Sequence, residues 1–133
     1  MMEILLELPF PPSINHYYKT VRTKSSIKIY IGEDGLRYRE EVMSLVVQHK
    51  QKTGNPYQIP YFKDERLSLE AHVFPFDKRK RDLDNLMKAL LDSLQHAYVF
   101  KNDNQIDSLL IERYSPQTKS CVIVKIKPII CVL

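Results

Sequence analysis

The chain has few of the residues on which several common functional sites depend. Its two cysteines, Cys121 and Cys131, form no C-x-x-C pair, so we expect a reduced cytoplasmic protein without a zinc site. Three glycines in the whole chain are too few for either common glycine-rich phosphate loop. No apolar run approaches the length of a membrane helix or a signal peptide, so we expect no membrane contact.

The size and charge of the chain favour one small basic domain. At 133 residues it is long enough for a single core, and we predict one domain over 1–133. The net charge of +4 and the pI near 9.0 are compatible with nucleic-acid binding but do not require it. The cations are clustered, however. The first basic cluster has no acid between its members: Lys19, Arg22, Lys24 and Lys28. The second is a continuous run of four cations: Lys78, Arg79, Lys80 and Arg81.

The hydrophobic pattern predicts an α+β fold. Alternating apolar residues or short apolar runs predict strands over 3–8, 26–31, 67–73, 105–113 and 120–127. Helical periods predict two main helices, over 36–51 and 83–97. The polar, tyrosine-rich segment 13–28 gives no clear period. We therefore expect one mixed sheet with the two main helices packed on it.

The stretch 78–92, KRKRDLDNLMKALLD, carries the strongest functional signal. Its apolar residues form one helical stripe: Leu83, Leu86, Met87, Leu90, Leu91 and, just beyond, Leu94. Four cations and two aspartates lie at the start of this helix. Groups that could hold phosphates therefore lie beside carboxylates that could hold a metal ion.

The acids of this stretch suit a hard divalent cation. Asp82 and Asp84, without nearby cysteine or histidine, favour Mg²⁺, with Mn²⁺ as a substitute. Such an ion suits phosphodiester hydrolysis. Lys88 follows Asp84 by one turn, about 6 Å along the axis, where its ammonium could neutralise charge on a phosphate. Asp92 is about 12 Å from Asp84 along the axis, too far to share its ion.

Two acids follow the helix, Asp103 and Asp107, and Asp103, in the turn before a predicted strand, is the better placed candidate for a third ligand. If the helix runs to 97, returning to the level of Asp84 requires about 20 Å in six residues, the limit of an extended chain. Either the helix ends a turn earlier or a partner subunit supplies Asp103, and the sequence leaves both open.

Each of these features also has a purely structural interpretation. An aspartate at a helix start is often a cap, a basic run is often a solvated loop, and Asp103 lies in a turn-forming N-D-N context. On that interpretation the chain would be a non-catalytic DNA-binding or architectural protein.

Three motifs in the same order resemble the RusA family of Holliday junction resolvases, which is common on phages and prophages. Residues 8–18 are similar to its L-P-x-P-P-S-x-N-x-Y-Y segment, and 81–94 to R-D-x-D-N-x-x-K-x-x-x-D-x-L. Residues 103–106 are similar to D-x-Q-[VI]. The resemblance covers nearly the whole chain. One departure is Asn102, where many members have an acid.

The resemblance implies a homodimeric, Mg²⁺-dependent endonuclease that binds four-way DNA and nicks two strands symmetrically in recombination and repair. It makes Asp82, Asp84 and Asp103 the metal-binding catalytic acids and Lys88 the catalytic lysine. The expected DNA contacts are Asn15 and the two basic clusters: Lys19, Arg22, Lys24, Lys28, Lys78, Arg79, Lys80 and Arg81. Tyr17 and Tyr18 could stack on unpaired bases or be buried. A nuclease acting on other branched DNA is the alternative within the same fold.

Overall fold

The structure is a computed structural model that describes residues 2–130. Its strands and helices follow in chain order: β1 (Ile4–Leu8), α1 (Ile14–Tyr17), β2 (Tyr18–Arg22), β3 (Ile27–Ile31), α2 (Glu33–Thr53), β4 (Leu67–Phe74), α3 (Asp84–His96), the 3-10 turn η1 (Asp103–Gln105), β5 (Ile106–Arg113) and β6 (Cys121–Pro128).

Four of the strands form one mixed sheet in the order β1-β6-β4-β5. β6 is antiparallel to both β1 and β4, and β4 is parallel to β5. Alternate residues of β4 are buried, because successive side chains of a strand point to opposite faces. This sheet and its helices confirm the predicted α+β class.

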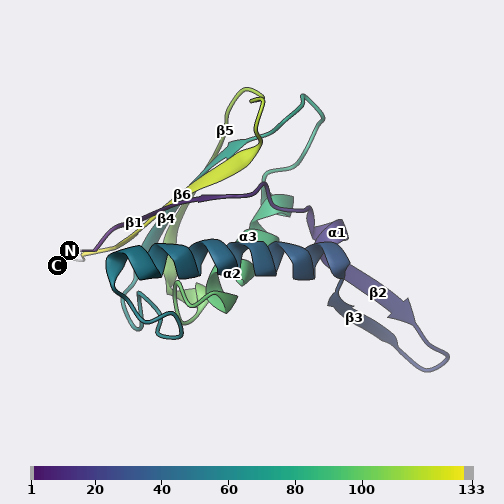
Figure 1. Ribbon diagram of the computed structural model, residues 1–133. Coiled ribbons are helices and arrows are strands. Elements are labelled where there is room, and N and C mark those ends of the chain that lie inside the picture. The colour runs from purple at the N-terminus through teal and green to yellow at the C-terminus, as the bar shows by residue number, and fades with distance from the viewer. Residues whose placement is uncertain (1, 131–133) are drawn as a thin grey trace.

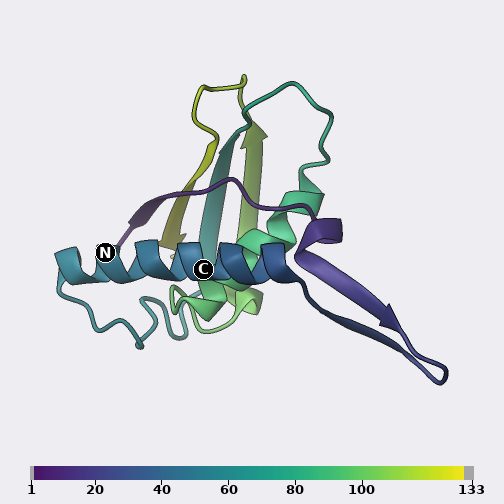
Figure 2. The same ribbon diagram turned by 45° about the vertical axis from the view of Figure 1, so that its right-hand side comes forward.

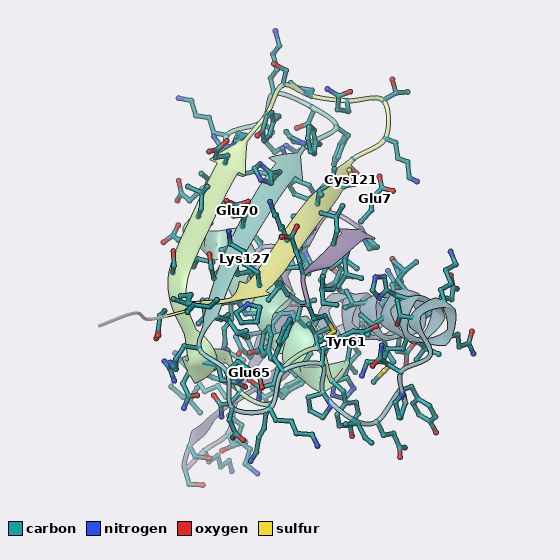
Figure 3. The ribbon with its side chains drawn as sticks, turned by 90° about the vertical axis from the view of Figure 1, so that its left-hand side faces the viewer. Glu7, Tyr61, Glu65, Glu70, Cys121 and Lys127 are labelled. Atoms are coloured by element: carbon teal, nitrogen blue, oxygen red, sulfur yellow. The ribbon has the colours of Figure 1, made fainter. Side chains whose placement is uncertain are left out.

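The helices α2 and α3 form a layer on one face of the sheet (Figure 1). α2 buries Tyr38, Val42 and Val46, which lie at helical spacing on one side. α3 buries most of the leucine stripe predicted from the sequence, including Leu90 and Leu94. Figure 3 looks onto the opposite face of the sheet, where polar side chains such as Glu70 and Lys127 stand. The core therefore lies between one sheet face and the two main helices.

Strands β2 and β3 form a separate two-stranded antiparallel ribbon, which we call the arm (18–31). The arm projects away from the body of the molecule (Figures 1 and 2). The expectation that 26–31 joins a single mixed sheet was therefore wrong. That segment pairs with β2, a strand that the sequence pattern did not reveal because none of its residues is fully buried. Ile27 and Ile29 are 60% and 68% exposed on the arm.

The other boundaries differ little from those expected. α2 is longer than predicted at both ends, running to Thr53 and ending at Gly54, whose φ of 74° is the left-handed conformation that glycine favours. The short helix α1 was not predicted. In the described part of the chain, no helix is both long enough and apolar enough to cross a membrane.

A buried lysine makes hydrogen bonds to the loop that follows α2. Lys50 is 0% exposed, and its Nζ donates hydrogen bonds to the carbonyl oxygens of Tyr57, Ile59 and Tyr98 at 3.1, 2.7 and 2.8 Å. Its ammonium also lies 4.9 Å from the ring centre of Tyr61. Burial lowers the pKa of Lys50 to about 8. This contact joins the loop 54–62 to the turn that follows α3.

Candidate functional site

The site predicted from the sequence begins at the N-terminal end of α3. In Figures 1 and 2 this end lies close to α1, between the basic loop 75–83 and the arm. Asp84 is the first residue of the helix, Asp82 lies two residues before it, and both are exposed. The amphipathic stripe of α3 explains their exposure, because it turns its leucines into the core and leaves this face to solvent.

Neither aspartate caps the helix. The residue directly before α3 is Leu83, which has no capping group, and within residues 2–130 no backbone N–H donates to the carboxylate of Asp82 or Asp84. The Asp82 carboxylate accepts one long hydrogen bond, 3.5 Å from Asn85 Nδ2. Within residues 2–130 no hydrogen bond or ion pair involves the Asp84 carboxylate. The structural interpretation of these acids as caps therefore finds no support, and both carboxylates are open to a ligand.

Asp103 lies at the other end of α3. Its backbone N–H donates to Gln95 Oε1 at 2.9 Å, and Gln95 is in the last turn of the helix. The eleven residues from Asp84 to Gln95 span roughly 16 Å at the usual helical rise. Among the residues that the structure describes, no three acid, histidine or cysteine side chains lie close enough to hold a metal ion. One chain therefore brings Asp82 and Asp84 to one end of the helix and Asp103 to the other.

The turn that carries Asp103 is held by its neighbours. Asn102 caps η1 by accepting from the Asn104 N–H at 2.9 Å, and its own N–H donates to Gln105 Oε1 at 2.9 Å. Gln105 is buried and donates to the Glu65 carbonyl at 3.0 Å. Asn102 thus has a structural use here, as the cap of η1. The hydrogen bond to Gln95 holds the backbone of Asp103, and the residue is partly exposed.

Lys88 lies on the exposed side of α3 and forms an ion pair with Asp92. The Nζ to Oδ1 distance is 3.1 Å, and Tyr18 donates its hydroxyl to the other oxygen of Asp92 at 3.3 Å. The hydrogen bond to Asp92 raises the pKa of Lys88, which outweighs the opposing effect of burial. Sequence reasoning excluded Asp92 as a metal ligand but missed this pairing, although the i, i+4 spacing was visible.

The second basic cluster divides into exposed and packed members. Lys78, Arg79 and Lys80 are exposed. The Arg81 guanidinium instead lies over the rings of Phe10 and Phe76, 5.4 and 5.1 Å from their centres. It also donates to Asp77 Oδ1 at 2.7 Å, and this bond lowers the pKa of Asp77. Arg81 is therefore engaged within the loop, unlike the three cations before it.

A groove of about 540 Å³ passes beside Asp82. One wall comes from the segment 10–16 and the other from the loop before α3. Its lining includes Phe76, Arg79 and Lys80 on one side and His16 on the other. Phe76 is 58% exposed. The groove thus offers positive charge and an exposed aromatic ring next to a free carboxylate.

The arm carries the first basic cluster on two faces. Cross-strand partners share a face, and Lys19 pairs with Tyr30 while Lys28 pairs with Val21. Arg22 pairs with Ile27 on the opposite face. All of the cluster's cations are exposed. Asn15 is exposed in α1 beside the root of the arm.

The two tyrosines at the root of the arm, Tyr17 and Tyr18, are packed rather than free. Tyr17 is 0% exposed, and its ring meets that of Tyr18 edge-on at 5.0 Å. Tyr18 is half-buried. Of the two expectations for these residues, burial fits Tyr17.

Comparisons with known proteins confirm the family resemblance that the motifs carry. The family model described as Endodeoxyribonuclease RusA matches residues 9–127. The chain belongs to the RusA family. It is 34% identical over 113 residues to the crossover junction endodeoxyribonuclease rusA of Enterobacteria phage HK97, covering 85% of this chain and 84% of that protein. The protein of the same name from Shigella sonnei (strain Ss046) is 33% identical over 101 residues, covering 76% and 74%.

Another RusA protein, from Escherichia coli (strain K12), is 32% identical over 101 residues, which is 76% of this chain and 74% of that protein. Members of the RusA family are crossover junction endodeoxyribonucleases, so the chain is a nuclease by membership. A nuclease of this family implies a divalent metal ion in general.

Proposed function

We propose that this chain, as a homodimer, resolves four-way DNA junctions by Mg²⁺-dependent hydrolysis of two phosphodiester bonds. The observation that carries the proposal is the pair of exposed carboxylates, Asp82 and Asp84, which have no ion pair among the described residues and lie at the start of α3 between two basic surfaces. The relatives are named for action on crossover junctions. A four-way junction has two-fold symmetry, so a two-fold dimer offers it two identical sites.

The donor set fits a hard cation. Carboxylate oxygens are the protein ligands that Mg²⁺ prefers, and it completes its shell with water and substrate phosphate. Asp82 and Asp84 from one end of α3, together with Asp103, would hold the ion. When bound there, it would supply Lewis-acid activation of the phosphate and of the attacking water. Mn²⁺ would serve as a substitute.

Asp103 of the partner subunit completes the site in this proposal. The separation of roughly 16 Å along α3 supports this arrangement over a site built within one chain, because α3 continues to His96 instead of ending a turn earlier. A two-fold axis near the middle of α3 would bring each Asp103 to the other chain's Asp82 and Asp84. Each chain would contribute two half-sites, the pair Asp82 and Asp84 at one end of α3 and Asp103 at the other. Two complete sites would then form from the four half-sites of a dimer.

The basic surfaces would bind the sugar–phosphate backbone, and Lys88 would stabilise negative charge on the phosphate under attack. Lys78, Arg79 and Lys80 flank Asp82 directly. The arm would add contacts farther along a DNA arm through its exposed cations and through Asn15 at its root. Arg81 would act indirectly, by holding the loop.

The activity is tested with a synthetic immobile four-way junction, incubated with and without Mg²⁺, with every nick mapped. We expect paired nicks at symmetric positions that require the metal. A flapped substrate and a linear duplex of the same sequence serve as comparisons. Cleavage of the flap in preference to the junction would show a nuclease for other branched DNA, and binding without cleavage would show a non-catalytic protein.

The shared site is tested by mixing subunits. Asp84→Asn and Asp103→Asn chains, each inactive alone, are unfolded together and refolded as a mixture. A mixed dimer with shared sites has one intact site, because its unaltered Asp84 and its unaltered Asp103 come from different chains. We therefore expect single nicks from the mixture. If each site lay within one chain, both sites of the mixed dimer would be damaged and the mixture would stay inactive.

A further inference from the structure

The middle of α3 carries a three-residue network between the two half-sites. Lys88 donates to one oxygen of Asp92 at 3.1 Å, and Tyr18 donates to the other at 3.3 Å. The Lys88 side chain is 43% exposed and that of Asp92 only 24%. Both oxygens of Asp92 are therefore engaged, one by α3 itself and one by the start of β2.

Tyr18 is a firm anchor for this network. Its ring packs edge-on against Tyr17, which is fully buried. Tyr17 in turn lies against α2 where Gly35 leaves no room for a side chain, since an added Cβ would come within 2.6 Å of the Tyr17 carbonyl oxygen. A hydroxyl fixed in this way restricts the rotamers available to Asp92, and Asp92 then restricts Lys88.

Lys88 has a second acid within equal reach. Asp84 precedes it by four residues and Asp92 follows it by four, so both lie one turn away on the same side of the helix. On an isolated helix the pair with the acid on the N-terminal side is the better of the two. Within the described residues, however, Lys88 pairs with Asp92 and Asp84 has no ion pair. The pair that forms is thus the less favourable one on an isolated helix, and Tyr18 adds a hydrogen bond to its acid.

We infer that Asp92 and Tyr18 are positioning residues that hold Lys88 away from Asp84 and so keep the Asp84 carboxylate free for the metal ion. This inference rests on the proposed metal-dependent function. Without Asp92, the ammonium would turn to Asp84 and compete with the divalent cation for its oxygens. With Asp92 in place, the ammonium stays with Asp92, one turn beyond Lys88, and does not turn back to Asp84.

The test measures metal binding directly, by titrating the DNA-free protein with Mn²⁺ and following the free ion by electron paramagnetic resonance. We expect Asp92→Asn to weaken Mn²⁺ binding by about threefold, the scale of one exposed ion pair. Adding Lys88→Met to that variant should restore the wild-type affinity, because the competing cation is gone. Tyr18→Phe, which removes one hydrogen bond and no charge, should weaken binding in the same direction by a smaller factor.

Two controls separate positioning from a general effect of charge or folding. Asp64→Asn removes one negative charge from an exposed loop and should leave Mn²⁺ binding unchanged. Thermal unfolding identifies any variant that has lost its structure, and Tyr18→Phe then carries the test if Asp92→Asn does not fold.

Unchanged Mn²⁺ binding in Asp92→Asn would overturn the inference, and so would a loss that persists when Lys88→Met is added. A wild-type protein that binds no Mn²⁺ would overturn the proposed metal site itself, which is a different result from either of these.

Discussion

Replacing Lys50 by methionine should destabilise the protein strongly, although the lysine is not one of the proposed site residues. Methionine keeps the length of the side chain and its packing but removes three hydrogen bonds, those to the carbonyl oxygens of Tyr57, Ile59 and Tyr98. It also removes the ammonium that lies near the ring of Tyr61.

The size of the effect follows from these contacts. A carbonyl left without its partner costs about 1–3 kcal/mol, and the lower value applies here because the three residues are themselves partly exposed and water can reach them. Burying the ammonium opposes folding, as the lowered pKa of Lys50 shows. Methionine removes that cost, which is a second reason to use about 1 kcal/mol for each carbonyl. Three carbonyls at about 1 kcal/mol each give a loss of about 3 kcal/mol in the free energy of unfolding.

Urea unfolding followed by circular dichroism measures this loss in the free energy of unfolding. In thermal unfolding the same loss should appear as a fall of roughly 10 °C in Tm. The matched control is Lys52→Met, which removes an exposed lysine from the same last turn of α2 and should change stability by less than about 0.5 kcal/mol. If Lys50→Met were as stable as Lys52→Met, the three hydrogen bonds would contribute nothing net and the argument would be wrong.

Three further outcomes are expected. Gly35→Ala should lower the free energy of unfolding by about 1–3 kcal/mol, because the added Cβ would lie 2.6 Å from the Tyr17 carbonyl oxygen. The control is Gly32→Ala, whose Cβ would meet only the flexible side chain of Lys19, and equal falls in Tm for the two variants would contradict this reasoning. Asp84→Asn should abolish junction cleavage while binding persists or improves, since a negative charge near phosphate is lost; a variant that still cuts would remove the proposed metal role. Junction affinity should fall steeply with salt, and Lys28→Ala should reduce the slope of log K against log salt by about 0.9 if it contacts one phosphate. An unchanged slope would remove Lys28 from the binding surface.

The sequence predicted the elements whose pattern reflects burial. The leucine stripe of α3 and the alternation of β4 both describe one buried face, and both elements formed within a residue or two of the expected boundaries. Strand β2 had no such pattern, because the arm stands away from the core and is held by pairing with β3 rather than by a buried face. A strand of that kind leaves no hydrophobic periodicity in the sequence.

The residue types of the proposed site could be predicted from the sequence, but not their arrangement in space. Residue types and spacing suggested Asp82, Asp84 and Lys88, which stay predictions; Asp84 and Lys88 lie in α3, and Asp82 lies two residues before it. The location of Asp103 depends on where α3 ends and on the contact with Gln95, which are tertiary facts. The lysine buried at position 50 was equally hidden, because its partners are backbone carbonyls from two distant segments and leave no trace in side-chain chemistry.

If Asp103 completes the site of the other chain as proposed, the separation of Asp82 and Asp84 from Asp103 along α3 would also govern when the protein can act. A newly made chain that has not met a second copy would lack a complete metal site, so it would be harmless to the genome around it. Cleavage would then rise more steeply than in proportion to protein concentration at high dilution, and would vanish below the concentration at which dimers dissociate. The length of α3 would thereby act as a safeguard, making assembly a condition for cutting DNA.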